Sequence, residues 1–371
     1  MKYYLIAGEA SGDLHGANLM RAISEQDSAA EFFVFGGDQM AAIKNTSLRK
    51  HISEMSFMGF VEVLMNLNTI NKNMKYCKQD LLTVKPDVLI LIDFPGFNLR
   101  IAEFAKKNNF KVLYYISPKI WAWNTKRVYK IKKYVDRVYS ILPFEKDFYA
   151  KYECDVEYIG NPLKDAIANY AYDQNFKVKN QLTDKPILAI LPGSRKMELQ
   201  KIFPEMIVAA ERFKDYHVVV AGAGNLPLEY YHQFNIPSNF KLIYNQTYDI
   251  LNNAELAIVT SGTATLETAL FKVPQVVCYK ANAISVSIAR MLVKIKFISL
   301  VNLIVDRKIV TELIQEDCTA DNIEKELNLV RVGAKNHQQI MNDYDELFAR
   351  VAEPGASQRA AASIVKFLMN N

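Results

Sequence analysis

The sequence predicts an α/β protein built from two Rossmann-like halves, and three observations support this fold class. Short runs of β-branched and aromatic residues alternate with longer helical patterns along the 371 residues, as in parallel sheets covered by helices. These runs fall into two sets, separated at 160–185 by a stretch that Gly and Pro punctuate and that turns polar from 169 to 184. The length is sufficient for two or three domains that each bury a core.

The expected strands are the short runs rich in Val, Ile, Leu, Phe and Tyr, taken in chain order. In the first half they lie at 3–7, 32–35, 87–92, 111–116, 137–141 and 155–159. In the second half they lie at 186–191, 217–221, 241–244, 256–260 and 275–279. A final helix is expected at 357–368, and such a helix can cross back onto the first domain. We therefore expect one domain at 1–165, with 352–371 packed on it, and another at 166–351.

The composition is that of an ordinary globular protein. Half of the residues are hydrophobic, 23% are charged and the formal net charge is +5, which excludes disordered, collagen-like and coiled-coil classes. The four cysteines lie at least 40 residues apart with no CxxC, which favours a reducing compartment and argues against a structural zinc site. The apolar run at the start of the sequence is too short for a signal peptide, so none is expected. Three cations interrupt the apolar stretch 284–305, so no membrane-spanning helix is expected there.

Two turns of the first half carry candidate chemistry. The segment 8–13, GEASGD, follows the first strand and opens a helix near Leu14; its small residues would let a ligand approach the helix N-terminus. A tight turn capped by Ser11 or Asp13 explains the same segment. Asp93 ends a hydrophobic strand before a Pro-Gly turn, at the edge where open α/β sheets bind ligands. It suits a general base, and a cap for a helix starting near Asn98 is an equal alternative.

A basic run follows the fourth expected strand. Residues 119–137 hold seven cations and one acid, a local net charge of +6, and include both tryptophans of the chain, Trp121 and Trp123. Such a run beside aromatic residues suits nucleic acid, a phosphorylated lipid or an anionic membrane surface. A solvated helix face is the commoner explanation.

Two turns of the second half suit a nucleotide diphosphate. The stretch 192–195, PGSR, places a Gly-Ser turn and Arg195 before a helix, a cradle that a guanidinium would complete. In 261–267, SGTATLE, Thr263 and Glu267 would share one helix face, so the turn would hold phosphate and the carboxylate would accept two ribose hydroxyls. Helix capping explains either turn alone, and the pair together favours a nucleotide. No metal-ligand spacing occurs, and Asp343-Tyr344-Asp345 is interpreted as a solvated helix face.

Taken together, these segments resemble the lipid-A-disaccharide synthases. The matching blocks are GEASGD (8–13), MGFVEVL (58–64), KPD…IDFPGFN (85–98), SPKIWAW…KR (117–127), LPFEK (142–146), LPGSR (191–195), SGTATLE (261–267) and SLVNLI (299–304). The resemblance implies an inverting glycosyltransferase of the GT-B type, with two Rossmann-like domains facing each other across a cleft. It implies UDP-2,3-diacylglucosamine as donor, 2,3-diacylglucosamine 1-phosphate (lipid X) as acceptor, a β-1′,6-linked disaccharide 1-phosphate and UDP as products, and no metal or other cofactor.

The resemblance also assigns roles to individual residues. Asp93 matches the catalytic base and Arg195 the residue that stabilises the leaving diphosphate. Donor contacts are implied for Gly193, Ser194, Arg195, Ser261, Gly262, Thr263, Thr265, Glu267 and Asn302. Acceptor or cleft contacts are implied for Glu9, Ser11, Gly12, Trp123, Lys126 and Arg127. Gly96 departs from the family, since better-known relatives carry an acid there, which leaves a supporting carboxylate in doubt.

Acylated substrates imply a cytoplasmic enzyme that attaches peripherally to the anionic inner membrane of a Gram-negative bacterium. Membrane or acyl contact is expected in two stretches, at Phe57, Met58, Phe60, Val61 and Leu64, and at Arg290, Lys294 and Lys296. Core packing is the alternative for both. No nucleic acid partner is expected, and a homo-oligomer is left open. The rival hypotheses are another GT-B enzyme acting on UDP-N-acetylglucosamine and a non-catalytic nucleic-acid-binding protein.

Overall fold

The chain divides into two compact units, each built on a parallel sheet. The computed structural model describes residues 1–371 except 56–65, 225, 281–295, 352 and 371, and it leaves the side chain of Trp123 undescribed. One unit comprises Met1–Asp165 and Ala352–Asn371, and the other comprises Ala166–Val351. The expected membrane contacts at Phe57, Met58, Phe60, Val61, Leu64, Arg290 and Lys294 lie outside the described residues.

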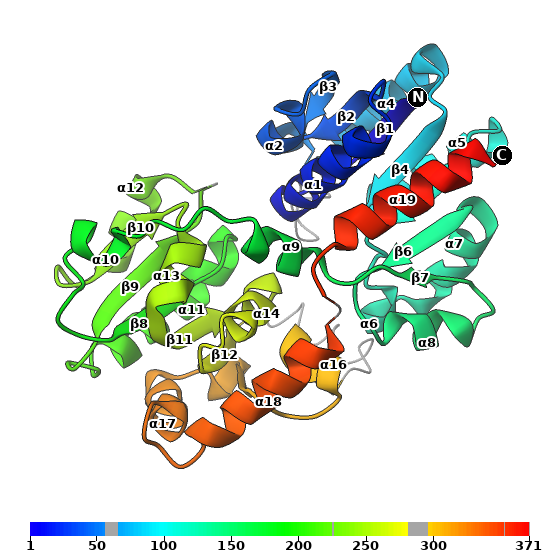
Figure 1. Ribbon diagram of the computed structural model, residues 1–371. Coiled ribbons are helices and arrows are strands. Elements are labelled where there is room, and N and C mark those ends of the chain that lie inside the picture. The colour runs from blue at the N-terminus through cyan, green and yellow to red at the C-terminus, as the bar shows by residue number, and fades with distance from the viewer. Residues whose placement is uncertain (56–65, 225, 281–295, 352, 371) are drawn as a thin grey trace. The chain divides into compact units, whose positions relative to one another are not determined.

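Within the described residues, the first unit forms a seven-stranded parallel sheet of order β3-β2-β1-β4-β5-β6-β7 (Figure 1). The strands are β1 (Lys2–Ile6), β2 (Glu31–Gly36), β3 (Thr46–His51), β4 (Val88–Ile92), β5 (Val112–Tyr115), β6 (Arg137–Ser140) and β7 (Glu157–Tyr158). The helices and 3-10 turns are α1 (Ala10–Gln26), α2 (Asp38–Ala41), η1 (Ile52–Glu54), α4 (Leu67–Val84), α5 (Pro95–Lys107), α6 (Ile120–Trp123), η2 (Thr125–Arg127), α7 (Val128–Tyr134), α8 (Glu145–Ala150) and α19 (Ala356–Met369). Helix α9 (Pro162–Ala168) contains the boundary between the two units.

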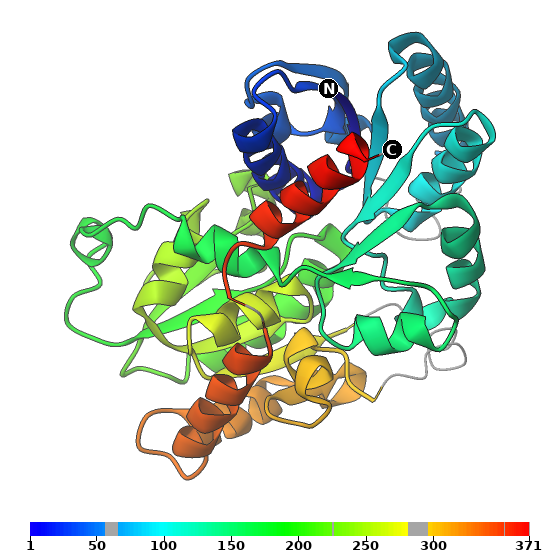
Figure 2. The ribbon, with the colours of Figure 1, turned by 45° about the vertical axis from the view of Figure 1, so that its right-hand side comes forward.

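Hydrophobic clusters cover both faces of this first sheet, so the central strands β1 and β4 are buried along nearly their whole length. The helices α1 and α19 cover one face and α4, α5 and α7 cover the other. Figures 1 and 2 show α19 beside α1. The carboxylate of Asp165 fixes the start of α19 by accepting hydrogen bonds from the amides of Gly355, Ala356 and Ser357. The C-terminal helix thus returns to the first unit, as the sequence predicts.

The second unit forms a six-stranded parallel sheet within the described residues, of order β10-β9-β8-β11-β12-β13. The strands are β8 (Ile187–Leu191), β9 (His217–Gly222), β10 (Lys241–Tyr244), β11 (Ala254–Thr260), β12 (Gln275–Tyr279) and β13 (Thr311–Ile314). The helices and 3-10 turns are α10 (Phe176–Lys179), α11 (Lys196–Ala210), α12 (Leu228–Tyr231), η3 (His232–Phe234), α13 (Thr247–Asn253), α14 (Thr263–Leu270), α16 (Leu300–Val305), η4 (Gln315–Asp317), α17 (Ala320–Val330) and α18 (His337–Arg350).

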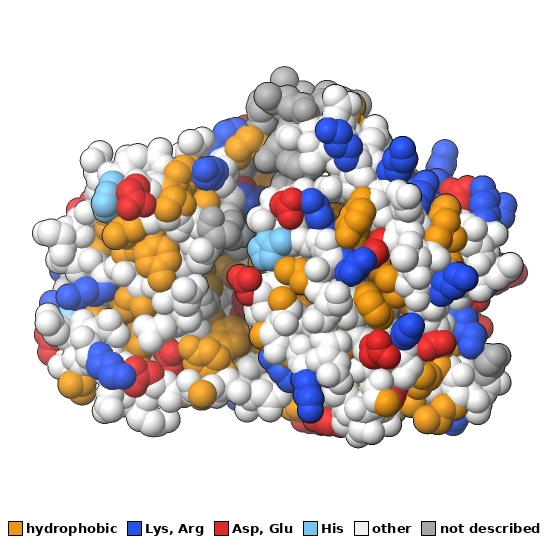
Figure 3. Space-filling model, turned by 90° about the horizontal axis from the view of Figure 1, so that it is seen from above, with side chains coloured by type: hydrophobic (Ala, Val, Ile, Leu, Met, Phe, Trp, Pro, Cys, Tyr) orange, Lys and Arg blue, Asp and Glu red, His pale blue; other side chains and the backbone are white. Residues whose placement is uncertain are grey.

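Alternating residues of β8 belong to two different hydrophobic clusters of this second unit. Leu188 and Ile190 pack with α11 and α17, whereas Ile187 and Ala189 pack with α10 and α13. Two doubly covered parallel sheets confirm the predicted fold class. None of the described helices combines the length and apolarity needed to cross a bilayer. On the face drawn in Figure 3, Lys and Arg side chains are interspersed with Asp and Glu.

Two strands escaped the sequence prediction. β3 and β13 both pair with a single neighbour at the edge of a sheet, and both carry polar residues, TSLRKH and TELI. Edge strands need only one buried face and often carry charge, so the apolar runs that identified the other strands are absent from them.

Candidate active site

The strand order of the first unit reverses between β1 and β4, so their loops share one edge of the sheet. Such a switch point is where open α/β sheets bind ligands. Helix α1 begins at Ala10, earlier than the sequence suggested, with Glu9 as its N-cap and Ser11 and Gly12 in its first turn. Glu9 is partly exposed, Ser11 is exposed and Gly12 is buried. The structure therefore presents two of the three predicted polar and small residues at this edge.

Asp13 has a structural task in this loop. Its buried carboxylate accepts hydrogen bonds from the amides of Gly37, Gln39 and Met40 at 2.7, 3.1 and 3.0 Å. The expectation that it caps its own helix is wrong, because its oxygens instead fix the turn that follows β2.

The backbone of Asp93 is held in an uncommon conformation at the end of β4. Asp93 and Phe94 have φ angles of 42° and 48°, a left-handed region that non-glycine residues rarely adopt and that often marks functional sites. The Asp93 carbonyl accepts hydrogen bonds from Asn98 Nδ2 at 2.8 Å and from the Tyr114 hydroxyl at 2.6 Å. Helix α5 starts at Pro95 with Phe94 as N-cap and no side-chain cap. The capping alternative for Asp93 is therefore wrong, and its carboxylate is left for another task.

The electrostatic surroundings of Asp93 suit a base that titrates above the ordinary range. Its side chain is partly exposed, and desolvation by the surrounding protein raises the pKa of its carboxyl. The ammonium of Lys119 and the Phe94 amide act against that rise. Lys119 is partly exposed at the start of α6, after the neighbouring strand β5. In the sequence, Lys119 belongs to a basic run, and its position after the fourth expected strand was the signal for its proximity to Asp93.

The tryptophan segment is anchored to the loop after β6. Trp121 Nε1 donates to Glu145 Oε1 at 3.1 Å, and the Leu142 amide donates to Glu145 Oε2 at 3.2 Å. Glu145 is buried, which raises its pKa to about 7. Trp121 also packs edge-on against Phe144, with ring centroids 5.0 Å apart. The α6 segment is thus tied to the same sheet edge as Asp93.

The basic run is only partly available to a ligand. Within it, Lys132 pairs with Glu153 at 3.1 Å and Arg137 with Glu157 at 3.8 Å. Lys126 is exposed on η2. Arg127 is partly exposed, and burial lowers its pKa.

The open position at Gly96 bears on the supporting acid that the resemblance to the family leads us to expect there. Gly96 is exposed in the first turn of α5, and a Cβ built on it meets no atom within 4 Å. A carboxylate would fit there and would be favoured by the helix N-terminus. The absence of an acid at this position is thus not forced by packing.

In the second unit the order reverses between β8 and β11, and the two predicted turns meet there. Gly193 has φ +92°, and a Cβ on it would lie 3.3 Å from Thr260 Cγ2 at the end of β11. Ser194 is exposed. Arg195 is the N-cap of α11, with its side chain half exposed and its Nη1 donating to Glu198 Oε1 at 3.0 Å. The guanidinium therefore stands at a helix N-terminus, where an anion is favoured.

The second turn begins α14 at Thr263, as the sequence predicts. Thr263 and Glu267 are partly exposed one turn apart. Burial raises the pKa of the Glu267 carboxyl, and a hydrogen bond from Tyr248 acts against that rise. Gly262 is exposed, and a Cβ on it would meet no atom within 4 Å. The turn thus leaves room for ligand atoms.

Three predicted donor residues have hydrogen bonds that give them structural tasks. Ser261 Oγ donates to the Ile298 carbonyl at 3.2 Å, and the buried Thr265 Oγ1 donates to the Gly262 carbonyl at 2.8 Å. Asn302 is fully buried. Its Oδ1 accepts from two amides, and its Nδ2 donates to the Val310 carbonyl and to Glu312. Direct contact between Asn302 and a donor would have to displace one of these four bonds.

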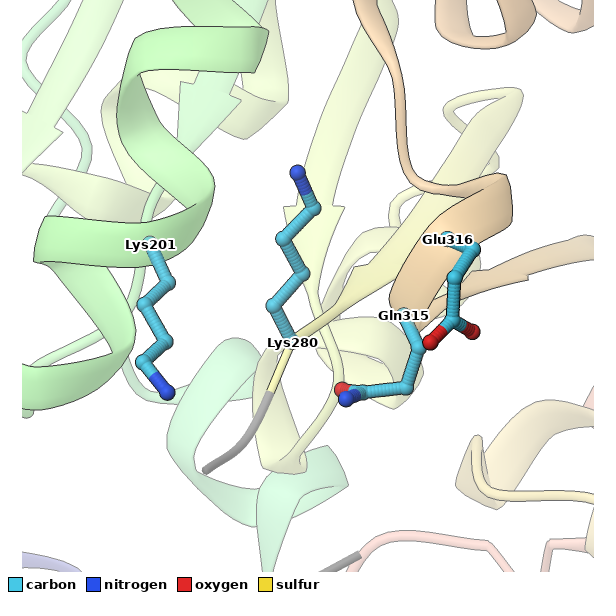
Figure 4. Close-up of a pocket in the computed structure, with 4 residues that line it drawn as sticks. All are labelled: Lys201, Lys280, Gln315 and Glu316. Atoms are coloured by element: carbon cyan, nitrogen blue, oxygen red, sulfur yellow. The ribbon is translucent and has the colours of Figure 1, made fainter. Parts of the chain in front are cut away.

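A pocket of about 400 Å³ lies at the same edge of the second sheet (Figure 4). Lys280 follows β12, Lys201 comes from α11, and Gln315 and Glu316 form the start of η4. Lys280 pairs with Glu205 at 2.8 Å. The lining thus carries two lysines and one glutamate, and Glu205, which is not a lining residue, offsets the charge of Lys280. No sequence motif indicates this pocket, because its residues come from three separate segments.

Two further candidates have ionic partners in the second unit. Lys296 is exposed, 3.7 Å from Asp306. Asp343 is buried and pairs with Arg307 at 2.8 Å, so the expectation of a solvated face is wrong for this residue. No group of three His, Cys, Asp or Glu side chains in the described part of the chain is arranged to hold a metal ion.

Comparison with known proteins gives a consistent family assignment. The family model described as lipid-A-disaccharide synthetase matches residues 3–367. Lipid-A-disaccharide synthase of Myxococcus xanthus is 36% identical, with 98% of this chain and 97% of that protein covered. The enzyme of the same name from Psychromonas ingrahamii is 38% identical, with 99% and 97% covered.

Solved structures resemble the chain in fold. A UDP-GlcNAc 2-epimerase of Methanocaldococcus jannaschii, in complex with UDP-GlcNAc and UDP, has a TM-score of 0.65 at 14% identity, with all of both chains covered. A Phytolacca americana enzyme, UGT2, complexed with UDP-2-fluoro-glucose and pterostilbene, has a TM-score of 0.64 at 11% identity, with 99% of each chain covered. At these identities the likeness shows the shared GT-B fold alone.

Proposed function

Because the chain belongs to the lipid-A-disaccharide synthase family, we propose that it joins UDP-2,3-diacylglucosamine to lipid X. It is a glycosyltransferase of lipid A biosynthesis. The products of the proposed reaction are the β-1′,6-linked disaccharide 1-phosphate and UDP. The observation that carries this proposal is a carboxylate, Asp93, at the carboxyl end of a central strand with its backbone fixed by Asn98 and Tyr114.

Asp93 is the general base of the proposed transfer. It takes the proton of the acceptor 6-hydroxyl as that oxygen forms a bond to the anomeric carbon of the donor. The bond from that carbon to the UDP oxygen breaks on the opposite side, so the configuration is inverted. Asp93 must be ionised to accept the proton, and Lys119 favours the ionised form.

The second unit stabilises the leaving group. Negative charge grows on the diphosphate as UDP departs, and Arg195 at the N-terminus of α11 supplies positive charge there. The turn at Gly193 and the start of α14 at Thr263 offer backbone amides to the phosphates. Glu267 accepts the ribose hydroxyls. This chemistry requires no metal ion or other cofactor in the proposed mechanism.

The substrates carry acyl chains, so the proposed enzyme works in the cytoplasm at the surface of the inner membrane. Support comes from α7, where Tyr129 is 62% exposed and the adjacent Lys130 is exposed, while Val128 and Ile131 are buried. An exposed aromatic residue beside cations suits an anionic lipid surface. No nucleic acid takes part in the proposal.

The test is a mass-spectrometric assay of disaccharide formation from the diacyl donor and lipid X in mixed micelles. Loss of a general base lowers kcat by about 10²–10⁴-fold, and we expect this for Asp93→Asn. The matched control is Asp87→Asn, directly before β4 at its other end, where the carboxylate accepts a hydrogen bond from the Lys2 amide at 2.7 Å. Its activity should stay close to that of the wild type.

Two results would contradict the proposal. Full activity of Asp93→Asn would remove Asp93 as the base. Faster turnover of UDP-N-acetylglucosamine than of its diacyl form by the wild type would favour the rival GT-B hypothesis.

A further inference from the structure

Tyr248 contacts the one carboxylate proposed to bind the ribose, although no motif singled it out. It lies on α13, and its hydroxyl donates to Glu267 Oε1 of α14 at 2.9 Å. Both side chains are partly exposed. The pair therefore stands at the sheet edge where the donor is proposed to bind, and not in the closed core.

The ring of Tyr248 packs against two other aromatic residues. It lies edge-on to Tyr170 with ring centroids 5.2 Å apart, and it is tilted against Phe271 with centroids 5.5 Å apart. Tyr170 is itself fixed, because its hydroxyl donates to Asp249 Oδ2 at 2.7 Å. Asp249 Oδ1 also accepts from the Asp173 amide at 2.8 Å. Packing and hydrogen bonds of this kind lock a side chain's orientation.

A carboxylate binds two neighbouring hydroxyls well only when its plane is fixed, because each oxygen must then point at one hydroxyl. An ionised carboxylate has about four acceptor positions. The Tyr248 hydroxyl occupies one of them on Oε1, which leaves Oε2 and the second position on Oε1 for a ligand. Thr263 lies one helical turn before Glu267 on the same face of α14. Thr263 would therefore bind a phosphate next to the ribose diol that Glu267 binds.

We propose that Tyr248 is a positioning residue that orients Glu267 toward the 2′- and 3′-hydroxyls of a ribonucleoside diphosphate. The inference rests on the proposed function, in which Glu267 binds the ribose. With Glu267 oriented in this way, the site would bind ribonucleotides more tightly than 2′-deoxyribonucleotides, which lack one of the two hydroxyls.

The experiment measures binding of UDP and 2′-deoxy-UDP by calorimetry to the wild type, Tyr248→Phe and Glu267→Gln. A hydrogen bond to a charged group contributes enough for about a tenfold change in affinity. We expect Tyr248→Phe to weaken the binding of UDP by about tenfold and the binding of 2′-deoxy-UDP much less. The ratio of the two affinities, UDP over 2′-deoxy-UDP, should therefore fall. In turnover, KM for the donor should rise while kcat changes little.

The pH profile gives a second readout that a merely structural role would not move. The Tyr248 hydroxyl lowers the pKa of the Glu267 carboxyl against the effect of burial. Without this donor the carboxyl binds its proton more tightly, so UDP binding should be lost at a higher pH as the solution is acidified. The direction of the shift is therefore upward in Tyr248→Phe.

Tyr170→Phe is the matched control, because it keeps the ring that packs against Tyr248 and removes a hydroxyl that is bonded to Asp249 and not to Glu267. It should leave the ratio and the pH profile unchanged. Equal weakening of both nucleotides by Tyr248→Phe, or equal effects of the two Phe variants, would overturn the inference and leave the family activity standing. A wild type that binds both nucleotides equally would remove the proposed role of Glu267, and the inference with it.

Discussion

The two sheets reverse their strand order at corresponding places, yet their loops there differ in character. In the first unit, a Cβ on Gly8 would lie 2.3 Å from the Phe94 ring, so an aromatic side chain already fills the approach to the turn. In the second unit, a Cβ on Gly193 would lie 3.3 Å from Thr260 Cγ2 and 3.7 Å from Glu198 Oε2, and a Cβ on Gly262 would meet no atom within 4 Å. The same topology is closed by protein atoms in one unit and open in the other.

The difference shows how one fold serves two tasks. The filled loop of the first unit has the Asp93 carbonyl held by two hydrogen bonds and presents the Asp93 carboxylate, which suits proton transfer. The open loop of the second unit presents Arg195 and two helix starts, which suit an anion. Loop residues thus set the chemistry, and the sheet only brings them to one edge.

The largest loss of activity that tests this difference should come from removing the cation of the open loop, Arg195. Arg195→Gln takes away the positive charge where the leaving diphosphate would develop its charge. Loss of one such group typically lowers kcat by about 10²–10³-fold, and we expect this loss in the disaccharide assay. Mixed-micelle kinetics with saturating lipid X would measure it.

Arg212→Gln is the matched control for this variant. Arg212 follows the other end of α11 and pairs with Asp321 and Glu324 at 2.7 and 2.6 Å, away from the strand-end loops. Its kcat should stay within about twofold of the wild type, because exposed ion pairs contribute little. A wild-type kcat in Arg195→Gln would assign the leaving-group charge to other residues of the second unit.

The sequence was sufficient for the fold where strands are apolar and insufficient where they are not. β4 and β8 are buried along their whole length, so their apolar runs were unmistakable, whereas the polar edge strands β3 and β13 left no such signal. Asp93 was placed correctly at a strand end, but its left-handed backbone and the Tyr114 hydrogen bond depend on tertiary contacts. Tyr248 acts through Glu267, 19 residues away, which no local pattern reveals, whereas the position of Lys119 after the fourth expected strand was a signal for its proximity to Asp93.

The filled loop of the first unit can be tested by overfilling it. Gly8→Ala would place a methyl group into the Phe94 ring, and overpacking of this kind lowers the free energy of unfolding by about 1–3 kcal/mol. Urea denaturation followed by circular dichroism would measure the change. Because Phe94 adjoins Asp93, kcat should fall as well.

Gly96→Ala is the matched control, since Gly96 is exposed on the same loop and a Cβ there meets no atom within 4 Å. Replacing this helical glycine should raise the free energy of unfolding by up to about 1 kcal/mol. If Gly8→Ala were as stable as Gly96→Ala, the Phe94 ring would be free to move, and the contrast between a filled and an open loop would fail.

The smallest expected effect concerns how the first unit keeps its carboxylate ionised. Burial raises the pKa of Asp93 and Lys119 lowers it, so Lys119→Gln should raise that pKa further. A base works only when deprotonated, and activity is lost as the pH falls through its pKa. The acid limb of kcat/KM should therefore move to higher pH in Lys119→Gln, whereas Lys119→Arg, which keeps the charge, should follow the wild type. An unshifted limb in Lys119→Gln would mean that the Phe94 amide alone opposes burial, so that the first unit tunes its base by backbone geometry and not by a neighbouring charge.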